Sequence, residues 1–248
     1  MRPKITKREF MNILLLGYGK MGQMIDSMAT AQGHHIVERI NIDNQSALEQ
    51  LDSDAIDVAI DFSQPSAAVS NIKWCIDHQI PSVVGTTGWL DQKEAVDKYC
   101  QSKDGTYLYA SNFSIGVNIF FKVNEFLAKL MNDKIGYRVS MKEIHHTQKL
   151  DAPSGTAITL AEGIINHNSS ISGWVNEASD HTEELPIISE RVDPTPGTHE
   201  ISYDSEIDSI DIRHTAHGRK GFAQGAIMVA QWIIGKKGVL TMDDFMQL

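Results

Sequence analysis

The chain has 248 residues, of which 42% are hydrophobic and 22% charged, enough for one large globular domain or two smaller ones. Its formal net charge of −10 argues against nucleic acid or an anionic membrane as a partner. We find no signal peptide or membrane span, and the two cysteines follow no metal spacing. The sequence therefore predicts a cytoplasmic protein that binds a small molecule, with residues 1–10 as an extension outside the fold.

The first elements in the chain predict a dinucleotide site. A buried strand at 12–16 leads into a G-x-G-x-x-G turn at 17–22, and a helical pattern follows that ends near Gly33. A second strand at 36–40 leads to Asp43, about 20 residues after the turn, where an acidic residue binds the adenosine ribose in such sites. The predicted cofactor contacts here are Gly17, Tyr18, Gly19, Lys20, Met21, Gly22 and Asp43.

The strand-and-helix pattern then repeats. Strands are predicted at 56–60, 81–84 and 106–109, with helices at 66–78 and 91–101. This alternation predicts a parallel, Rossmann-type sheet with right-handed crossovers. Ligands bind such sheets beyond the carboxyl ends of the strands. Small polar turns follow each of these three strands, so we expect them to line a path for the cofactor.

The second half of the chain predicts a separate α+β domain with a mostly antiparallel or mixed sheet. A helix is expected at 116–131, strands at 137–144, 187–192, 199–203 and 209–215, and a surface loop at 166–185. A last helix, 222–234, is predicted to return to the first sheet. The predicted domains are 11–113 with 220–248 for the dinucleotide, and 114–219 for substrate binding and oligomerisation.

The most informative segment runs from Glu143 to Ala157 and reads E-I-H-H-T-Q-K-L-D-A-P-S-G-T-A. Imidazole transfers protons near neutral pH, and lysine is a compact cation that suits a carboxylate or phosphate. A Ser-Gly-Thr turn that opens a helix offers backbone N–H groups and the positive end of a helix dipole. The segment therefore indicates an enzyme that acts on a small anionic substrate.

This segment resembles the signature of the dihydrodipicolinate reductase (4-hydroxy-tetrahydrodipicolinate reductase) family, in which H-H-x-x-K-x-D-A-P-S-G-T-A follows a glutamate. The turns D-F-S-Q-P at 61–65, G-T-T-G at 85–88 and A-S-N-F-S at 110–114 are similar to turns of the same family. The resemblance extends, with gaps, from Asn12 to the C-terminus. Arg191 and His199 match family positions, although the paired glycines that usually follow the arginine are absent.

The resemblance implies an oxidoreductase of the diaminopimelate route to lysine. The enzyme would use NADH and/or NADPH to reduce a cyclic dicarboxylate with loss of water, and it would be a homotetramer. It assigns proton donation to His145, with Lys149 assisting, and no metal. Substrate contacts would be His146, Ser154, Gly155 and Thr156, and further cofactor contacts Gly85, Thr86, Thr87, Ala110, Ser111, Asn112 and Phe113.

Several alternatives remain open from the residues alone. A related dehydrogenase acting on an amino-acid semialdehyde would share the glycine turn, as would a dinucleotide sensor without catalysis. The His pair could ligate a metal, but no His-Glu-x-x-His pattern is present. Asn44 stands where members using both cofactors often have arginine, so the choice between NADH and NADPH rests on Asp43 and Lys20.

Overall fold

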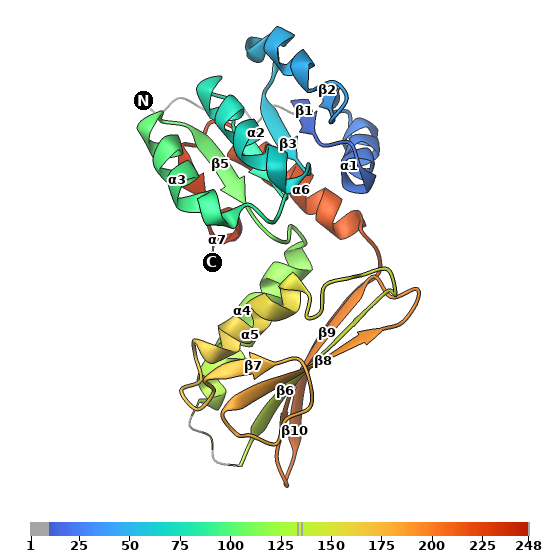
Figure 1. Cartoon of the computed structure of the whole chain (residues 1–248), viewed down its shortest axis with the longest axis vertical. Helices are drawn as coiled ribbons and strands as arrows, with labels where there is room; N and C mark the ends of the chain where they lie inside the picture. Colours follow the sequence, from blue (N-terminus) through green and yellow to red (C-terminus); the bar gives the residue numbers. More distant parts are fainter. Residues whose placement is uncertain (1–9, 133, 135, 248) are drawn as a thin grey trace. The chain divides into compact units, whose positions relative to one another are not determined.

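The computed structural model describes residues 10–132, 134 and 136–247, which form two compact units (Figure 1). The first unit contains the described residues up to Ser114 and from Phe222 onward, and the second contains those from Ile115 to Gly221. Most of the predicted extension at 1–10 lies outside the described residues. Among the described residues, no helix is long and apolar enough to cross a membrane.

The first unit is built on a six-stranded sheet in the order β11-β5-β4-β3-β1-β2, in which every neighbouring pair is parallel. Its strands are β1 (Asn12–Leu16), β2 (His35–Ile40), β3 (Val58–Asp61), β4 (Ser82–Val84), β5 (Thr106–Tyr109) and β11 (Gly238–Leu240). The order reverses direction at β1, so the carboxyl ends of β1 and its neighbours define a topological switch point where ligands bind. The predicted Rossmann-type sheet is confirmed.

Helices cover both faces of this sheet, with α2 and α3 on one face and α1 and α6 on the other (Figure 1). Because both faces are covered, β1 is buried over nearly its whole length and reads as a continuous apolar run. The helices are α1 (Lys20–Ala31), α2 (Pro65–Asp77), α3 (Lys93–Ser102), α6 (Lys220–Ile233), the short α7 (Met242–Met246), and the 3-10 helices η1 (Gln45–Gln50), η2 (Ser53–Ala55) and η3 (Leu90–Gln92).

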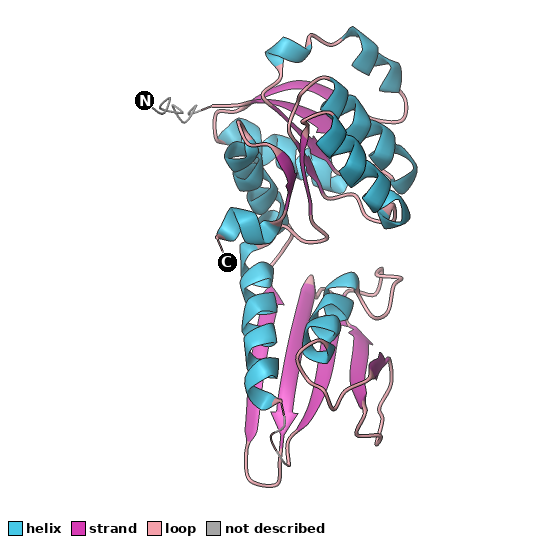
Figure 2. Ribbon diagram, turned by 90° about the vertical axis from the view of Figure 1, so that its left-hand side faces the viewer, coloured by secondary structure: helices cyan, strands magenta, loops and turns pink. Residues whose placement is uncertain are grey.

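The second unit packs two helices on one face of a five-stranded sheet (Figure 2). The strand order is β10-β9-β6-β8-β7, with antiparallel pairs at β10-β9 and β9-β6 and parallel pairs at β6-β8 and β8-β7. The elements are α4 (Ile115–Met131), β6 (Arg138–His145), α5 (Gly155–Ile165), β7 (Gly173–Val175), β8 (Glu184–Arg191), β9 (Gly197–Asp204) and β10 (Ser209–Ala216). The predicted mixed sheet is confirmed.

Strand β6 places the chemistry of this unit. Its residues alternate between buried and half-buried positions, and the buried row consists of Val139, Met141, Glu143 and His145. Val139 and Met141 join the apolar core under α4 and α5. Since alternate residues of a strand share a face, the same row that begins in the core ends with a carboxylate and an imidazole on the helix-covered side.

Several short elements differ from the sequence prediction. The prediction of a loop over 166–185 was wrong at β7, which pairs with β8, and β11 and α7 were not predicted at all. β7 and β11 have three residues each, too few to show an alternating pattern. Each takes its hydrogen bonds from a longer neighbouring strand, β7 from β8 and β11 from β5.

Candidate active site

The glycine turn after β1 is shaped for close approach of a ligand. Gly17 has φ +92°, and a Cβ there would stand 2.3 Å from the backbone oxygen of Phe62. A Cβ on Gly22 would stand 2.2 Å from the oxygen of Gly17, so both glycines are required by packing. Gly19 differs, because no atom lies within 4 Å of its Cβ position. The open space at Gly19, the N-cap of α1, fits a pyrophosphate at the helix N-terminus.

A cavity of about 510 Å³ opens beside this turn. Its lining includes Gly17, Tyr18, Gly19 and the predicted ribose ligand Asp43, whereas Lys20, Met21 and Gly22 form the first turn of α1 and are not among its lining residues. Asp43 is exposed on a loop that two asparagine side chains close. Asn44 Nδ2 donates to the oxygen of Arg39 (2.9 Å), and Asn41 Oδ1 accepts from the N–H of Asp43 (2.7 Å). Asn44 therefore has a structural role in shaping the loop.

A charged cluster lies next to this cavity. Arg39 donates to both oxygens of Asp26 through Nε (2.6 Å) and Nη2 (3.0 Å), and Tyr18 donates its hydroxyl to the same carboxylate (2.6 Å). The Arg39 guanidinium holds the pKa of Asp26 below its usual value. A bidentate pair of this kind fixes the guanidinium in place, so Arg39 is engaged within the protein although its strand leads to the ribose loop.

The predicted turns after β3 and β4 meet at the buried carboxylate of Asp61. Thr86 Oγ1 donates to Asp61 Oδ1 (2.7 Å), the N–H of Ser63 donates to the same oxygen (2.9 Å), and Asn71 donates to Oδ2 (2.9 Å). Burial raises the pKa of Asp61 against these hydrogen bonds. Sequence reasoning gave Asp61 no role, and the structure shows that it joins two turns expected to hold the cofactor.

The remaining predicted cofactor residues lie in the same unit. Gly85 faces the ring of Phe62, where a Cβ would stand 2.2 Å from Cε1, and Thr87 is exposed. Phe113 is buried and its ring centroid lies 5.8 Å from that of Phe62. Ala110 and Asn112 are buried and Ser111 is exposed, with Asn112 Oδ1 accepting from the N–H of Ser114 (2.9 Å).

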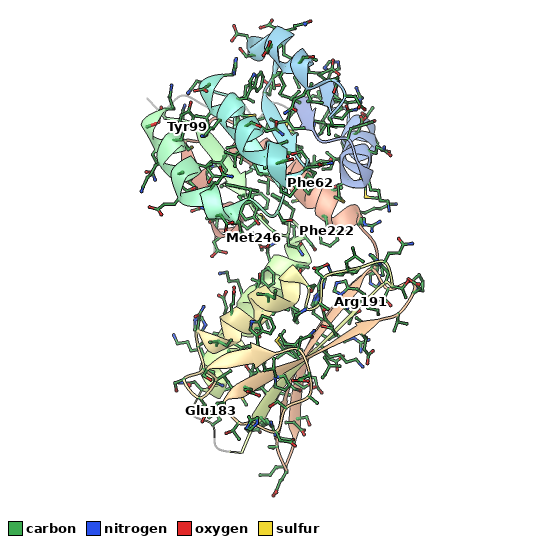
Figure 3. All side chains as sticks on the ribbon, viewed as in Figure 1. Phe62, Tyr99, Glu183, Arg191, Phe222 and Met246 are labelled. Atoms are coloured by element: carbon green, nitrogen blue, oxygen red, sulfur yellow. The ribbon has the colours of Figure 1, made fainter. Side chains whose placement is uncertain are left out.

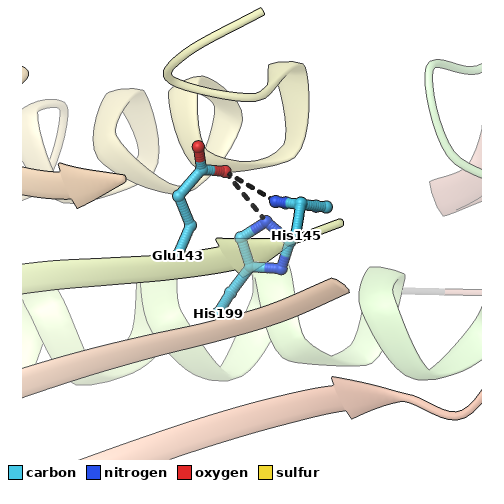
Figure 4. A group of neighbouring side chains, drawn as sticks. All are labelled: Glu143, His145 and His199. Atoms are coloured by element: carbon cyan, nitrogen blue, oxygen red, sulfur yellow. Dashed lines mark ion pairs between the residues drawn. The ribbon is translucent and has the colours of Figure 1, made fainter. Parts of the chain in front are cut away.

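In the second unit, the pairing of β6 with β9 sets Glu143 directly opposite His199. Glu143 Oε2 lies 3.4 Å from His145 Nδ1 and 3.7 Å from His199 Nε2, so two imidazoles face one carboxylate (Figure 4). The rings of the two histidines are nearly perpendicular, with centroids 5.2 Å apart. Glu143 is completely buried and both histidines are nearly so. The strand register thus assembles a group that is dispersed in the sequence.

The charges of this cluster follow from its surroundings. Burial alone would raise the pKa of Glu143, but hydrogen bonds from Ser154 and Ser189 and the nearby His145 lower it overall. Burial lowers the pKa of His145 against the opposing effect of Glu143. Burial also lowers the pKa of His199 to about 4. Near neutral pH the cluster therefore holds one ionised carboxylate and two neutral imidazoles.

The Ser-Gly-Thr turn predicted as an anion cradle lies at the start of α5. Ser154 is the N-cap, and its Oγ accepts from the N–H of Ala157 (3.2 Å). The N–H of Ser154 itself donates to both oxygens of Glu143 (3.1 and 3.2 Å), which ties the cradle to β6. No atom lies within 4 Å of a Cβ built on Gly155. The helix N-terminus at Gly155 therefore opens onto free space, which suits an anion.

Lys149 lies on the loop between β6 and α5. Its Nζ binds both carboxylate oxygens of Asp151 (2.7 and 2.8 Å), so a substrate carboxylate would have to replace Asp151. Arg191, labelled in Figure 3, holds the loop from β8 by donating to the backbone oxygens of Lys149 (3.3 Å) and Asp151 (2.6 Å). His146 is half-buried, and within the described part of the chain its Nδ1 has no hydrogen-bond partner.

The Glu143 cluster can be tested as a metal centre, since one ligand atom each from Glu143, His145 and His199 lies within 4.8 Å of the others. Two features oppose this use. The Arg191 guanidinium already binds Glu143 Oε1 at 3.2 Å, and the N–H of Ser154 occupies both oxygens. A divalent cation would thus meet a fixed positive charge and a carboxylate whose lone pairs are in use. The arrangement suits proton chemistry better than metal binding.

The Rossmann-type sheet with its glycine turn, and the buried imidazole cluster beside a helix N-terminus, define a dinucleotide-dependent oxidoreductase. Residues 11–113 match the family model for the N-terminus of dihydrodipicolinate reductase, and residues 116–246 match the model for its C-terminus. The chain belongs to the dihydrodipicolinate reductase family. Its cofactor is accordingly a nicotinamide dinucleotide.

Relatives over nearly the whole chain support this membership. The 4-hydroxy-tetrahydrodipicolinate reductase of Christiangramia forsetii is 48% identical over 234 residues, covering 94% of this chain and 97% of that protein. The enzyme of the same name from Alkaliphilus oremlandii is 32% identical and covers 96% of this chain and 99% of its own. The predicted family resemblance is confirmed.

Solved structures agree with the fold. The dipicolinate-bound dihydrodipicolinate reductase from Paenisporosarcina sp. TG-14 superposes with a TM-score of 0.75 at 22% identity, covering 95% of this chain and 99% of that chain. An amine dehydrogenase from Mycobacterium smegmatis gives a TM-score of 0.63 at 12% identity, covering 94% and 95%. The architecture is therefore shared with this dehydrogenase.

Proposed function

We propose that the chain reduces 4-hydroxy-tetrahydrodipicolinate to tetrahydrodipicolinate, with loss of water, in the diaminopimelate route to lysine. The observation that carries this proposal is the arrangement of the second unit. There the buried carboxylate of Glu143 lies beside the imidazole of His145 and accepts the N–H of Ser154 at the start of α5, and the ammonium of Lys149 lies on the loop between the two elements. Membership of the reductase family and two relatives with this enzyme name support the same activity.

The first unit is proposed to hold the cofactor, NADH and/or NADPH, which supplies hydride when bound. Gly17, Gly19 and the start of α1 suit its pyrophosphate, and Asp43 suits its ribose hydroxyls. Asp43 repels a 2′-phosphate, Asn44 is engaged in closing its loop, and Arg39 is paired with Asp26. These features favour NADH, while the exposed Lys20 leaves some capacity for NADPH.

In the second unit, we propose that Lys149 and the N–H groups of Gly155 and Thr156 bind the substrate carboxylates. Ser154 would hold the turn, and His146 would contribute a further contact. The dicarboxylate assignment is consistent with the dipicolinate named for the Paenisporosarcina structure. Each charge-assisted hydrogen bond contributes roughly 1.5–3 kcal/mol, which is enough to make the carboxylates the main determinant of affinity.

His145 is proposed as the proton donor. Hydride addition to a conjugated imine leaves an enamine, whose carbon then needs a proton. Burial keeps His145 neutral in the free protein, whereas an incoming dianion would raise its pKa and so favour the imidazolium form. Substrate binding would in this way load the donor with the proton that the reaction consumes.

The organisation of the chain is proposed to follow the same division, with residues 11–113 and 220–248 for the dinucleotide and 114–219 for substrate and assembly. We further propose a homotetramer formed through the second unit. The α4 helix exposes a stripe of apolar side chains (Ile119, Val123, Phe126 and Leu130), of the kind that marks contact surfaces. Native mass spectrometry of the full chain tests the assembly, and a monomer would contradict it.

A coupled assay tests the activity directly. Pyruvate, aspartate semialdehyde and the upstream synthase generate the unstable substrate, while NADH and NADPH are followed separately by absorbance. Oxidation of cofactor should require the synthase and this chain together. If neither cofactor is oxidised, the proposal fails. Oxidation without the synthase would instead favour a dehydrogenase acting on the semialdehyde.

A further inference from the structure

Arg191 joins several parts of the second unit. Its Nη2 donates to Glu143 Oε1 (3.2 Å) and to the oxygen of Asp151 (2.6 Å), and its Nε donates to the oxygen of Lys149 (3.3 Å). One guanidinium on β8 thus connects a buried carboxylate on β6 with the backbone of the loop that carries Lys149. The planar fork of an arginine suits contacts with several acceptors at fixed angles.

Glu143 completes the connection from the other side. Its Oε2 faces His145 Nδ1, and both of its oxygens accept the N–H of Ser154, the residue that caps α5. Ser154 Oγ in turn lies 3.2 Å from His199 Nε2, and either of these two atoms can be the donor. The carboxylate of Glu143 therefore lies beside the imidazoles of His145 and His199 and also binds the N-cap residue of α5.

We propose that the Glu143–Arg191 pair is a positioning unit that fixes the proton donor His145, the Lys149 loop and the start of α5 relative to one another. Neither residue is proposed to touch the substrate. The roles given to His145 and Lys149 rest on the proposed function, whereas the contacts of the pair do not. Holding catalytic groups within about 1 Å of their working geometry is worth up to 10²-fold in rate.

The two members of the pair act on His145 in opposite directions. The negative charge of Glu143 raises the pKa of His145, and the positive charge of Arg191 lowers it. Lys149 and Asp151 on the loop, of opposite sign, also act on the ring, and the neutral His199 on β9 lies beside it. Removing one member at a time should therefore shift the titration of His145 in opposite senses.

A purely structural reading of the pair makes a different prediction. Buried ion pairs often contribute little net stability, because desolvation offsets the attraction, and breaking one leaves an uncompensated charge. If the pair served stability alone, both single substitutions would lower the melting temperature but leave kcat and KM of the folded enzyme near native. Loss of either charge shifts the pKa of His145 in both cases, so the kinetic constants, together with the titration, separate positioning from stability.

The experiment compares Glu143→Gln, Arg191→Gln and Arg191→Lys in the full chain, with Glu190→Gln as the matched control. Glu190 neighbours Arg191 on β8 and pairs with Lys142 (2.8 Å) at half-exposed positions. Histidine side-chain NMR reads the pKa of His145, whose signal is identified by its loss in His145→Gln. Glu143→Gln should lower this pKa by about half a unit or more, and Arg191→Gln should raise it.

Turnover gives the second readout. Glu143→Gln should reduce kcat by about tenfold or more and move the alkaline limb of its pH profile to lower pH. Arg191→Lys keeps the charge but not the fork, so the His145 titration should stay near native while KM for the substrate rises. Glu190→Gln should change neither.

Two outcomes would overturn the proposal: shifts of the same sign in Glu143→Gln and Arg191→Gln, or native kcat and KM in both, whatever their titration. The NMR titration requires no turnover and so reports on the pair whatever the substrate is. A native enzyme that oxidises no cofactor in the coupled assay would sink the proposed function alone.

Discussion

Gly197 on β9 lies against the ring of His145, because a Cβ built on Gly197 would stand 3.1 Å from His145 Nε2 and 3.3 Å from Cδ2. That spacing is tighter than ordinary van der Waals contact, so a side chain at 197 would require the ring to shift by a few tenths of an ångström. On the same strand, two residues further on, His199 faces Glu143 of β6. Gly197 and His199 thus both lie beside the imidazole of His145.

Gly197→Ala should therefore displace the His145 ring. We expect kcat to fall roughly tenfold to a hundredfold, because a small misplacement of a catalytic group carries a cost of that size. The affinity for the cofactor should not change. Gly173→Ala is the matched control, since a Cβ on this strand glycine meets no atom within 4 Å. Near-native kcat in Gly197→Ala would show that the ring tolerates a neighbour there.

His145→Gln tests the proton donor itself. Removing a general acid lowers turnover by about 10²–10⁴-fold, and the cofactor dissociation constant should barely change because the glycine turn belongs to the other unit. Steady-state kinetics and calorimetry measure the two quantities. His181→Gln, at an exposed histidine, controls for a general effect of losing an imidazole. A His145→Gln enzyme with native turnover would remove His145 from this role.

The pKa of His199 makes a prediction about stability. Burial lowers this pKa from 6.5 to about 4, so between these pH values the unfolded chain binds a proton that the folded chain does not. The free energy of unfolding should be fully maintained above pH 6.5 and should fall as the pH drops towards 4. One such group contributes on the order of 3 kcal/mol. Denaturant titrations at several pH values measure this loss, and His199→Gln should reduce it.

Glu143 also contributes to the loss of stability in acid, because its pKa is lowered in the folded chain. Its contribution disappears as the pH falls through its lowered folded pKa, so the His199→Gln chain should still weaken in acid, but by less than the native chain. Equal losses in the two chains would show that His199 is accessible to protons when folded.

The choice of cofactor depends on Asp43. Its carboxylate accepts from ribose hydroxyls and repels a 2′-phosphate, so Asp43→Ala should weaken NADH binding more than NADPH binding. Calorimetric titration of both cofactors measures the difference. Asp54→Ala, an exposed acid of the same unit outside the cavity lining, is the control. Clearly tighter binding of NADPH than NADH by the native protein would contradict the assignment.

Much of the first unit is predictable from sequence because its signals are local. The apolar run at 12–16 and the glycines that follow it are contiguous, and the structure has β1 at Asn12–Leu16 and the N-cap of α1 at Gly19. The Ser-Gly-Thr turn is local in the same sense, and α5 begins at Gly155. Each element is specified by neighbouring residues whose preferences agree.

The links between elements could not be predicted in this way. Glu143 meets His199 only through the register of β6 against β9, and a shift of one residue would turn His199 to the other face. The contacts of Arg191 with the Lys149 loop depend on the parallel pairing of β6 with β8, in which His145 lies opposite Arg191. The engagement of Arg39 by Asp26 likewise requires α1 to pack beside β2.

The anion site offers the most direct test of the proposed substrate. Lys149 and the first turn of α5 should bind carboxylates whether or not the ring that carries them can be reduced. Pyridine-2,6-dicarboxylate should therefore inhibit competitively with the substrate, and pyridine-2-carboxylate should bind at least about tenfold more weakly. This follows because each lost charge-assisted hydrogen bond costs roughly 1.5–3 kcal/mol.

Lys149→Ala should remove most of the difference between the two inhibitors, if Lys149 anchors the second carboxylate after releasing Asp151. Lys142→Ala is the control, because Lys142 pairs with Glu190 and not with the loop. Inhibition constants from initial rates at several substrate concentrations give the comparison. Equal inhibition of the native enzyme by both compounds would mean that the site recognises one carboxylate only, and the dicarboxylate assignment would then fail.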